Sequence, residues 1–277
     1  GVRIAVIGGY CLDAYWFLDP AHAERSIETG MPVHAVRQQR YTLGGAGNVV
    51  MNLCAMGVRH VDAFGVIGDD PYGRHMLRLL AQQQVGVAGM LLQSAAWATH
   101  VYTKPYLHDT EQNRIDFGAF NELHDQTAHA LTSALAVRMA DVDAVIINEQ
   151  VASGIHHSPC FQELLQTLIT EHPGSIFVLD SRHYSGRYAG TIRKLNEHEA
   201  ARQCGSMRGD DEVILDAEAR AAAQTLWQRW SRAVFVTRGA RGCLAHDAAG
   251  LHEIPGLQLS GRVDPVGAGD SMLAGIA

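Results

Sequence analysis

The sequence lacks the features that mark membrane proteins and general nucleic-acid binders. No uninterrupted apolar run approaches the roughly 20 residues that a helix needs to cross a bilayer. The 22 lysines and arginines are outnumbered by 29 aspartates and glutamates, whereas proteins that bind nucleic acid broadly usually carry a basic face. We therefore expect a cytoplasmic protein that binds neither a membrane nor a nucleic acid.

Cysteine and histidine patterns typical of metal sites are also missing. The five cysteines are an odd number, widely spaced and without a CxxC pair, which indicates neither a disulfide framework nor a zinc site. Among the 15 histidines, His156 and His157 are adjacent, but no HExxH occurs. We expect no transition metal held by protein ligands.

Three common active-site motifs are absent as well. The sequence has no GxxxxGK[ST] of the P-loop and no GxSxG of the α/β-hydrolase elbow. Gly8 and Gly9 follow a predicted strand, but the third glycine of GxGxxG is missing and no helical pattern follows. This argues against a dinucleotide-binding fold.

What the sequence does contain is a regular alternation of strands and helices. The predicted strands include residues 2–8, 60–66, 143–147, 175–179 and 233–237, and the predicted helices include 74–84, 123–139, 159–170 and 217–230. This order predicts an α/β fold with a mostly parallel central sheet and helices on both faces. We expect residues 1–277 to form a single domain.

Two stretches break this alternation. Residues 26–43 give short extended pieces interrupted by Gly30 and Pro32, and residues 88–118 read as strands with no helix between them. We predict that the second stretch, from Leu91 and Leu92 onward, pairs antiparallel outside the main sheet. Together these insertions, at about 14–43 and 88–118, would form a small β lid.

The last fourteen residues read as a loop that opens into a helix. Here Gly267, Ala268 and Gly269 precede an apolar helical pattern, and the free N–H groups at a helix start bind anions. Asp270 follows at once and would repel an anion unless its carboxylate had another task. Taking a proton from an incoming hydroxyl is such a task, and the arrangement is kinase-like.

A second glycine-rich turn lies at Gly44-Gly45-Ala46-Gly47-Asn48. Three glycines at a helix start cost backbone entropy, which indicates a close approach to a ligand, and Asn48 offers a donor and an acceptor for hydroxyl groups. The alternative is a tight turn with Asn48 as a local cap. Asp13 follows the first strand, at the edge where open α/β sheets bind ligands, although a solvated loop residue is the simpler interpretation.

Two further segments each allow two interpretations. Asn196 and Glu199 have the spacing of a helix capping box, and they could instead orient a hydrated Mg²⁺, which takes few protein ligands. The loop from Thr237 to Gly242 is either a hairpin turn or the edge of a nucleotide site.

Taken together and in this order, five segments resemble the ribokinase (PfkB) family of carbohydrate kinases. They are GGAGNVVMNLCAMG, VIGDDPYG, NEHE, TRGARG and DPVGAGD, and they extend over essentially the whole chain. Residues 12–16 and 44–57 look most like the heptose 7-phosphate kinase branch, which phosphorylates a sugar phosphate at its anomeric hydroxyl. Residues 148–154 depart from the SDYGKG-like segment of that branch.

The resemblance implies a ribokinase-like three-layer α/β/α sandwich and a kinase that uses ATP and Mg²⁺. Asp270 would be the general base, and the backbone of Gly267, Ala268 and Gly269 would form the anion hole for the transferring phosphoryl group. The residues that would hold the sugar are Asp13, Gly44, Gly45 and Asn48.

The nucleotide side of the site follows from the same resemblance. Asn196 and Glu199 would lie at the Mg²⁺-phosphate region, with Glu199 acting on the metal through water. Thr237, Gly239 and Gly242 would form the nucleotide edge.

The resemblance also bears on assembly and on alternative functions. Some members pair two subunits through the lid, some bind a monovalent cation near the last motif, and the family fold normally continues with further C-terminal helices. The alternatives to a sugar or sugar-phosphate kinase are a nucleoside kinase of the same fold and a catalytically silent sugar-binding or regulatory protein.

Overall fold

The computed structural model describes residues 1–209, 211–257 and 266–277. Asp264 and Pro265, the first two residues of the last motif, lie outside the described residues. None of the helices in the described part of the chain is long and apolar enough to cross a membrane.

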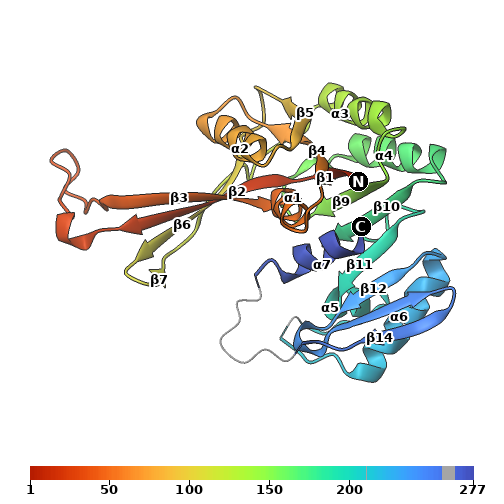
Figure 1. Cartoon of the computed structure of the whole chain (residues 1–277). Coiled ribbons are helices and arrows are strands. Elements are labelled where there is room, and N and C mark those ends of the chain that lie inside the picture. The colour runs from red at the N-terminus through yellow and green to blue at the C-terminus, as the bar shows by residue number, and fades with distance from the viewer. Residues whose placement is uncertain (210, 258–265) are drawn as a thin grey trace.

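Among the described residues, nine strands form the main sheet in the order β14-β13-β12-β11-β10-β9-β1-β4-β5 (Figure 1). Neighbouring strands from β12 to β5 are parallel, and β13 and β14 add to one edge as antiparallel strands. The strands are β1 (Arg3–Gly8), β4 (His60–Ile67), β5 (Gly86–Leu92), β9 (Ala144–Glu149), β10 (Ile176–Ser181), β11 (Ile192–Asn196), β12 (Val234–Thr237), β13 (Cys243–Asp247) and β14 (Gly250–Ile254).

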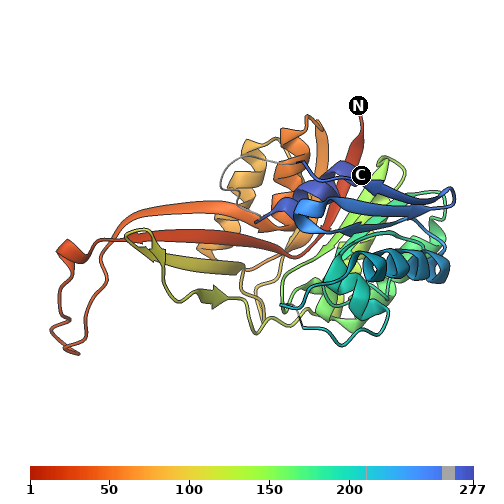
Figure 2. The ribbon, with the colours of Figure 1, turned by 90° about the horizontal axis from the view of Figure 1, so that it is seen from below.

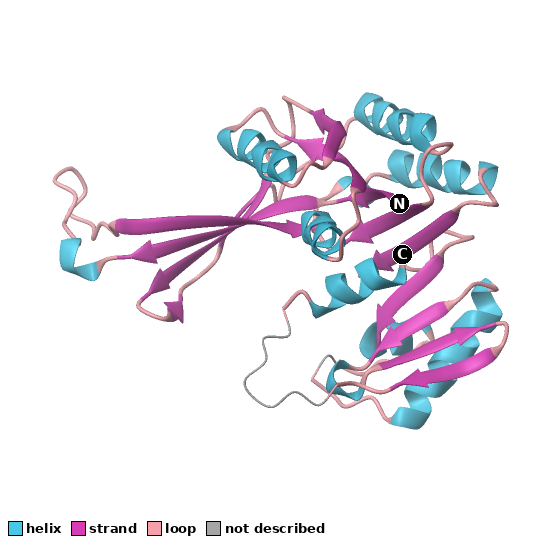
Figure 3. Ribbon diagram, in the orientation of Figure 1, coloured by secondary structure: helices cyan, strands magenta, loops and turns pink. Residues whose placement is uncertain are grey.

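Helices cover both faces of this sheet (Figure 3). Side chains alternate along β1, so that Ile4 and Val6 pack with α1, α2 and α7, whereas Ala5 and Ile7 pack with α3 and α4. The predicted three-layer α/β/α sandwich is therefore confirmed. The helices are α1 (Ala46–Ala55), α2 (Pro71–Gln82), α3 (Asp125–Arg138), α4 (Pro159–Glu171), α5 (Glu197–Gln203), α6 (Asp216–Trp230) and α7 (Ala268–Ile276).

A second, smaller sheet projects from the body as a long ribbon (Figures 1 and 2). Strand β2 pairs antiparallel with β3 and parallel with β6, and β7 and β8 pair antiparallel with β6. We call this sheet the lid. Its strands are β2 (Tyr10–Leu18), β3 (Val36–Gly45), β6 (His100–Leu107), β7 (Thr110–Glu111) and β8 (Ile115–Phe117).

One prediction about the second insertion is wrong. Leu91 and Leu92 belong to β5, which pairs parallel with β4 in the main sheet, because helix α2 provides the crossover that parallel strands need. The predicted antiparallel pairing outside the main sheet is confirmed for β6 with β8. The lid begins at Tyr10, and β6 runs parallel to β2. The long connection between β2 and β6 permits this parallel pairing.

Candidate active site

Helix α7 begins at the predicted glycine turn. Gly267 caps it with a left-handed backbone, φ 80°, and a side chain there would lie 2.9 Å from Nδ2 of Asn48. Glycine is therefore required twice over, for the backbone angle and for the close approach. Ala268, Gly269 and Asp270 form the first turn, where N–H groups lack intrahelical partners.

The two glycine-rich turns meet, although their residues are 222 positions apart. Nδ2 of Asn48 donates a hydrogen bond of 2.6 Å to Oδ2 of Asp270. One turn further along α1, Oδ1 of Asn52 accepts a hydrogen bond of 2.9 Å from Oγ of Ser271, the residue after Asp270. Asn48 does not cap its own helix, so the interpretation as a local cap is wrong.

Burial raises the pKa of the Asp270 carboxyl, and the hydrogen bond from Asn48 and the charges of Lys194 and Arg182 only partly oppose this rise. A carboxylate with a raised pKa holds an accepted proton more readily at neutral pH. The geometry therefore suits Asp270 to accept a proton from a hydroxyl placed beside it.

Replacing Asn48 with Ala should move the acidic limb of the kcat profile to higher pH. The general base must be deprotonated, and loss of the hydrogen bond removes one influence that lowers its pKa while burial remains. The measurement is kcat against pH at saturating sugar. Asn52→Ala loses the bond from Ser271 and the bond that Nδ2 of Asn52 donates to the carbonyl oxygen of Asn48, but it leaves the side chains of Asn48 and Asp270 in place. It is the control, and an unshifted limb in Asn48→Ala would contradict the prediction.

The lid brings Asp13 to the same place. Asp13 lies on β2, with Oδ1 2.7 Å from Nζ of Lys104 on β6. A side chain on Gly44 would lie 2.8 Å from Oδ2 of Asp13, so this glycine makes room for the carboxylate. A cavity of about 420 Å³ is lined by Asp13, Tyr15 and Asn48, among others. Asp13 is thus not a solvated loop residue.

The backbone conformation explains why residue 45 is a glycine. Its φ is 57°, it precedes α1, and a side chain would collide with the carbonyl oxygen of Gly9. Contact of Gly44 and Gly45 with a sugar stays a prediction.

Asn196 and Glu199 form the capping box of α5. The backbone N–H of Glu199 donates to Oδ1 of Asn196 at 2.8 Å, and the N–H of Asn196 donates to Oε2 of Glu199 at 2.7 Å. The structural interpretation is confirmed. Both side chains also line a cavity of about 630 Å³, together with Arg182, His183, His198 and Arg202.

The oxygen donors that this cavity offers to a magnesium ion are the Glu199 carboxylate and the Asn196 amide. Among the residues that the structure describes, no group of three or more histidine, cysteine or acidic side chains could hold a metal. Mg²⁺ usually keeps several waters and binds few protein oxygens. Glu199, whose Oε2 is used in the capping box, still faces the cavity, and its role toward Mg²⁺ stays a prediction.

The loop after β12 is a hairpin turn, as one of the two interpretations predicted. Thr237 pairs with Cys243 across it, and a side chain on Gly242 would collide with the carbonyl oxygen of Ile254. Gly239, with φ 56°, begins the 3-10 turn Gly239–Arg241. Thr237 lies beside Asn196 in the sheet register. A nucleotide edge at this loop therefore stays a prediction.

A buried ion pair that no sequence motif indicates lies beneath α7. Nζ of Lys194 on β11 lies 2.8 Å from Oδ2 of Asp180 on β10, and the two side chains are 7% and 1% exposed. A side chain on Gly269 would lie 2.9 Å from the same Nζ. The chain has only two lysines, and each pairs with an aspartate of the candidate site, Lys104 on the lid side and Lys194 beneath the helix start.

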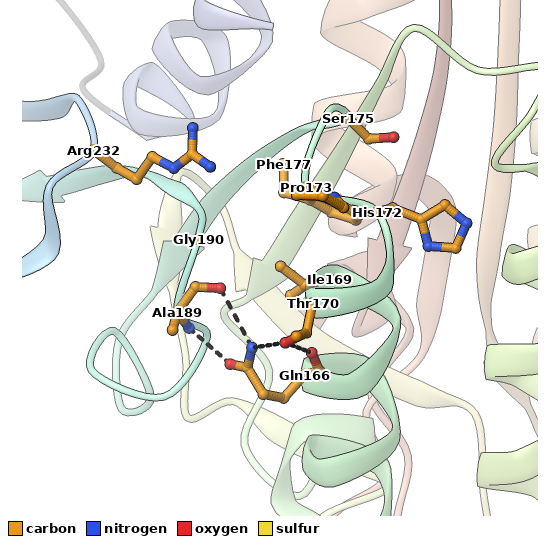
Figure 4. Close-up of a pocket in the computed structure, with 10 residues that line it drawn as sticks. All are labelled: Gln166, Ile169, Thr170, His172, Pro173, Ser175, Phe177, Ala189, Gly190 and Arg232. Atoms are coloured by element: carbon orange, nitrogen blue, oxygen red, sulfur yellow. Dashed lines mark hydrogen bonds between the residues drawn. The ribbon is translucent and has the colours of Figure 1, made fainter.

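A third cavity, of about 250 Å³, lies at the amino ends of the strands of the main sheet (Figure 4). Its lining includes Ser175, which precedes β10, and Arg232, which precedes β12. Open α/β sheets bind ligands at the carboxyl ends of their strands. The candidate site is therefore the edge where β9, β10, β11 and β12 end, not this cavity.

The sequence is similar to those of several known proteins. The family model described as pfkB family carbohydrate kinase matches residues 6–277. A bifunctional protein HldE from Hydrogenovibrio crunogenus is 27% identical over 277 residues, covering 99% of this chain and 54% of that protein. A D-beta-D-heptose 7-phosphate kinase from Bordetella bronchiseptica is 28% identical over 289 residues, covering 99% of this chain and 83% of that protein.

The fold has solved counterparts as well. The tetrameric inhibited form of phosphofructokinase-2 from Escherichia coli superposes with a TM-score of 0.75 at 19% identity, covering 99% of this chain and 86% of that chain. The chain spans 54% of the length of the bifunctional relative described above. The match of the family model over residues 6–277 shows that this chain belongs to the pfkB family of carbohydrate kinases.

Proposed function

We propose that this protein transfers the γ-phosphoryl group of ATP to a hydroxyl of a sugar or sugar phosphate. The observation that carries the proposal is the contact of Asn48 with Asp270. It places a carboxyl with a raised pKa in the first turn of α7, beside N–H groups that can hold an anion. A proton acceptor next to an anion site is what phosphoryl transfer to a hydroxyl requires.

In this mechanism Asp270 accepts the proton of the attacking hydroxyl, and Asn48 keeps the carboxylate oriented. Charge on the transferring group spreads over its equatorial oxygens, and the N–H groups of Gly267, Ala268 and Gly269 would stabilise it there. One preorganised donor of this kind can be worth about 3 kcal/mol. Asn196 and Glu199 would hold a hydrated Mg²⁺, which supplies charge neutralisation at the phosphates.

The lid favours an acceptor that already carries a phosphate. The Lys104 ammonium and the Arg40 guanidinium lie 5.1 and 4.6 Å from the ring centre of Tyr15, next to Asp13. Cations of this kind bind a phosphate through charge-assisted hydrogen bonds. The Bordetella relative is named for a heptose 7-phosphate, and we propose a substrate of that class.

The lid is also suited to exclude water. Its strands project from the body of the molecule (Figure 2), and Asp13 on β2 lines the cavity beside Asn48. Closure over the sugar would prevent transfer to water. The lid carries exposed apolar residues, among them Val36, Ile115 and Phe117, and we propose that two copies of the chain can pair through it.

A screen of free sugars, sugar phosphates and nucleosides for ADP release tests this function. We expect turnover with a sugar phosphate, and in Lys104→Met a KM for that substrate about tenfold higher, equivalent to about 1.4 kcal/mol of lost binding. Turnover of nucleosides alone would favour a nucleoside kinase. Sugar binding in calorimetry without ATP binding or ADP release would favour a sugar-binding protein instead.

A further inference from the structure

The Glu149 carboxylate, at the carboxyl end of β9, is buried and fully engaged in hydrogen bonds. Its Oε2 accepts hydrogen bonds of 2.8 Å from Oγ of Ser181 and from the backbone N–H of His183, and its Oε1 lies 3.0 Å from Nδ1 of His183. Only 4% of Glu149 is exposed. A buried carboxylate is costly unless its oxygens are bonded in this way, so the surrounding structure is held tightly around it.

These partners flank Arg182 on both sides. The backbone N–H of Arg182 itself donates to the carbonyl oxygen of Glu149 at 3.2 Å. Oγ of Ser181 accepts from the N–H of Tyr184 at 2.8 Å, and Oγ of Ser185 donates to the carbonyl oxygen of Ser181 at 2.6 Å. The segment 181–185 is therefore fixed to the end of the sheet.

The Arg182 side chain, by contrast, has no hydrogen bond or ion pair within the described ranges of the chain. It lines the cavity of about 630 Å³ that also contains Asn196 and Glu199. Its charge lowers the pKa of Asp270, which places the guanidinium near the candidate base. Arg238 and Arg241, in the neighbouring loop, are paired with carboxylates.

We propose that Arg182 binds a phosphoryl group of the nucleotide and that Glu149 is a positioning residue that fixes the backbone carrying it. The inference rests on the proposed kinase function. It concerns the nucleotide rather than a phosphate on the sugar, because Arg182 shares its cavity with Asn196 and Glu199, whereas Asp13 and Tyr15 line another.

The chemistry of Arg182 and Glu149 supports these two roles, phosphate binding and positioning. A guanidinium is always charged and presents a planar fork of donors to phosphate oxygens. Holding its backbone in place beforehand reduces the entropy that binding would otherwise cost. Glu149 lies in the stretch 148–154, where the sequence departs from the heptose branch, so the sequence resemblance does not supply this arrangement.

The direct test of Arg182 is steady-state kinetics with ATP as the varied substrate. We expect kcat/KM for ATP to fall about 100-fold in Arg182→Ala and less in Arg182→Lys, with the KM for sugar unchanged in both. Arg187→Ala, an exposed arginine of the same loop, is the control and should behave as wild type. A rise in the KM for sugar with no change toward ATP would overturn the assignment to the nucleotide.

The test of Glu149 is a double-mutant cycle. In Glu149→Gln the side-chain amide replaces a carboxylate oxygen that accepts a hydrogen bond, and we expect kcat/KM for ATP to fall about tenfold when Arg182 is present and not at all in the Arg182→Ala background. Equal losses in both backgrounds would show a merely structural role. Ser181→Ala, which removes one donor to the carboxylate, provides the same cycle if Glu149→Gln does not fold, and exposed Glu163→Gln on α4 is the control.

Calorimetry with MgATP separates this inference from the proposed function. Wild type that binds MgATP more tightly than Arg182→Ala, with no sugar turned over, would support the assignment of Arg182 and defeat the kinase proposal. Equal affinity of the two proteins would overturn the assignment of Arg182. Absence of MgATP binding by wild type would overturn both.

Discussion

Asp270→Asn is expected to lower kcat by about 10²–10⁴-fold while sugar affinity stays within about threefold of wild type. The amide has the size of the carboxyl and can still accept the hydrogen bond from Asn48, so the helix start should keep its structure. It cannot accept the proton of the attacking hydroxyl. The loss should therefore appear in kcat and not in binding.

Asp125→Asn is the matched control for this variant. Asp125 also lies in the first turn of a helix, α3, so the same change of charge beside a helix N-terminus occurs away from the site. The measurements are ADP release at saturating ATP and sugar, and sugar affinity by calorimetry. Wild-type kcat in Asp270→Asn would remove Asp270 from the role of base, and an equal loss in Asp125→Asn would point to a general effect on stability.

The central part of the candidate site could be predicted from the sequence. Glycine-rich helix starts have few physical explanations, so the turns before Asn48 and Asp270 were identified from residue types alone. Parallel strands also end at one edge of the sheet, which explains why segments so distant in sequence share a site. The contact between the two side chains is a result of the structure.

The lid could be predicted only in outline. A strand pattern does not say which sheet a strand joins or in which direction it runs, because both depend on the connection. Leu91 therefore joined the main sheet through α2, and β6 followed β2 in parallel.

The charged residues beneath and beside α7 could not be predicted. Asp180 and Lys194 are neighbours only through the register of β10 with β11, and Ser181 faces Glu149 only through the register of β9 with β10. No motif of a single segment contains such a pair. A lysine two residues before Asn196, in a chain with two lysines, is the one feature of the sequence that could have indicated it.

Lys194→Met is expected to destabilise the fold by about 3–5 kcal/mol at pH 8, because it leaves the buried Asp180 carboxylate without its partner. Methionine has similar length and no charge, so the loss of packing is small. Lys104→Met is the matched control, since its partner Asp13 is 22% exposed, and we expect it to cost at most about 1 kcal/mol.

The dependence on pH distinguishes the ion pair from packing. Burial raises the pKa of Asp180 from 3.8 to about 6 even with Lys194 present, whose charge lowers it. A folded-state pKa above the unfolded one means that the folded state binds more protons. In the wild type, titration of Asp180 therefore lowers the free energy of unfolding as pH rises from about 4 to 6, and it has no further effect above that range. Without Lys194 the pKa rises further, and the loss continues to higher pH.

The difference in unfolding free energy between wild type and Lys194→Met should therefore widen above pH 6, by up to about 1.4 kcal/mol per pH unit. Urea unfolding at pH 6, 7 and 8 measures it. Adding Asp180→Asn to Lys194→Met removes the unpaired charge and should restore most of the stability lost at pH 8 while making it independent of pH in this range. An equal deficit at all three pH values, with no recovery in the double variant, would mean that Lys194 stabilises the site by packing alone and that its charge beneath Gly269 is not required for folding.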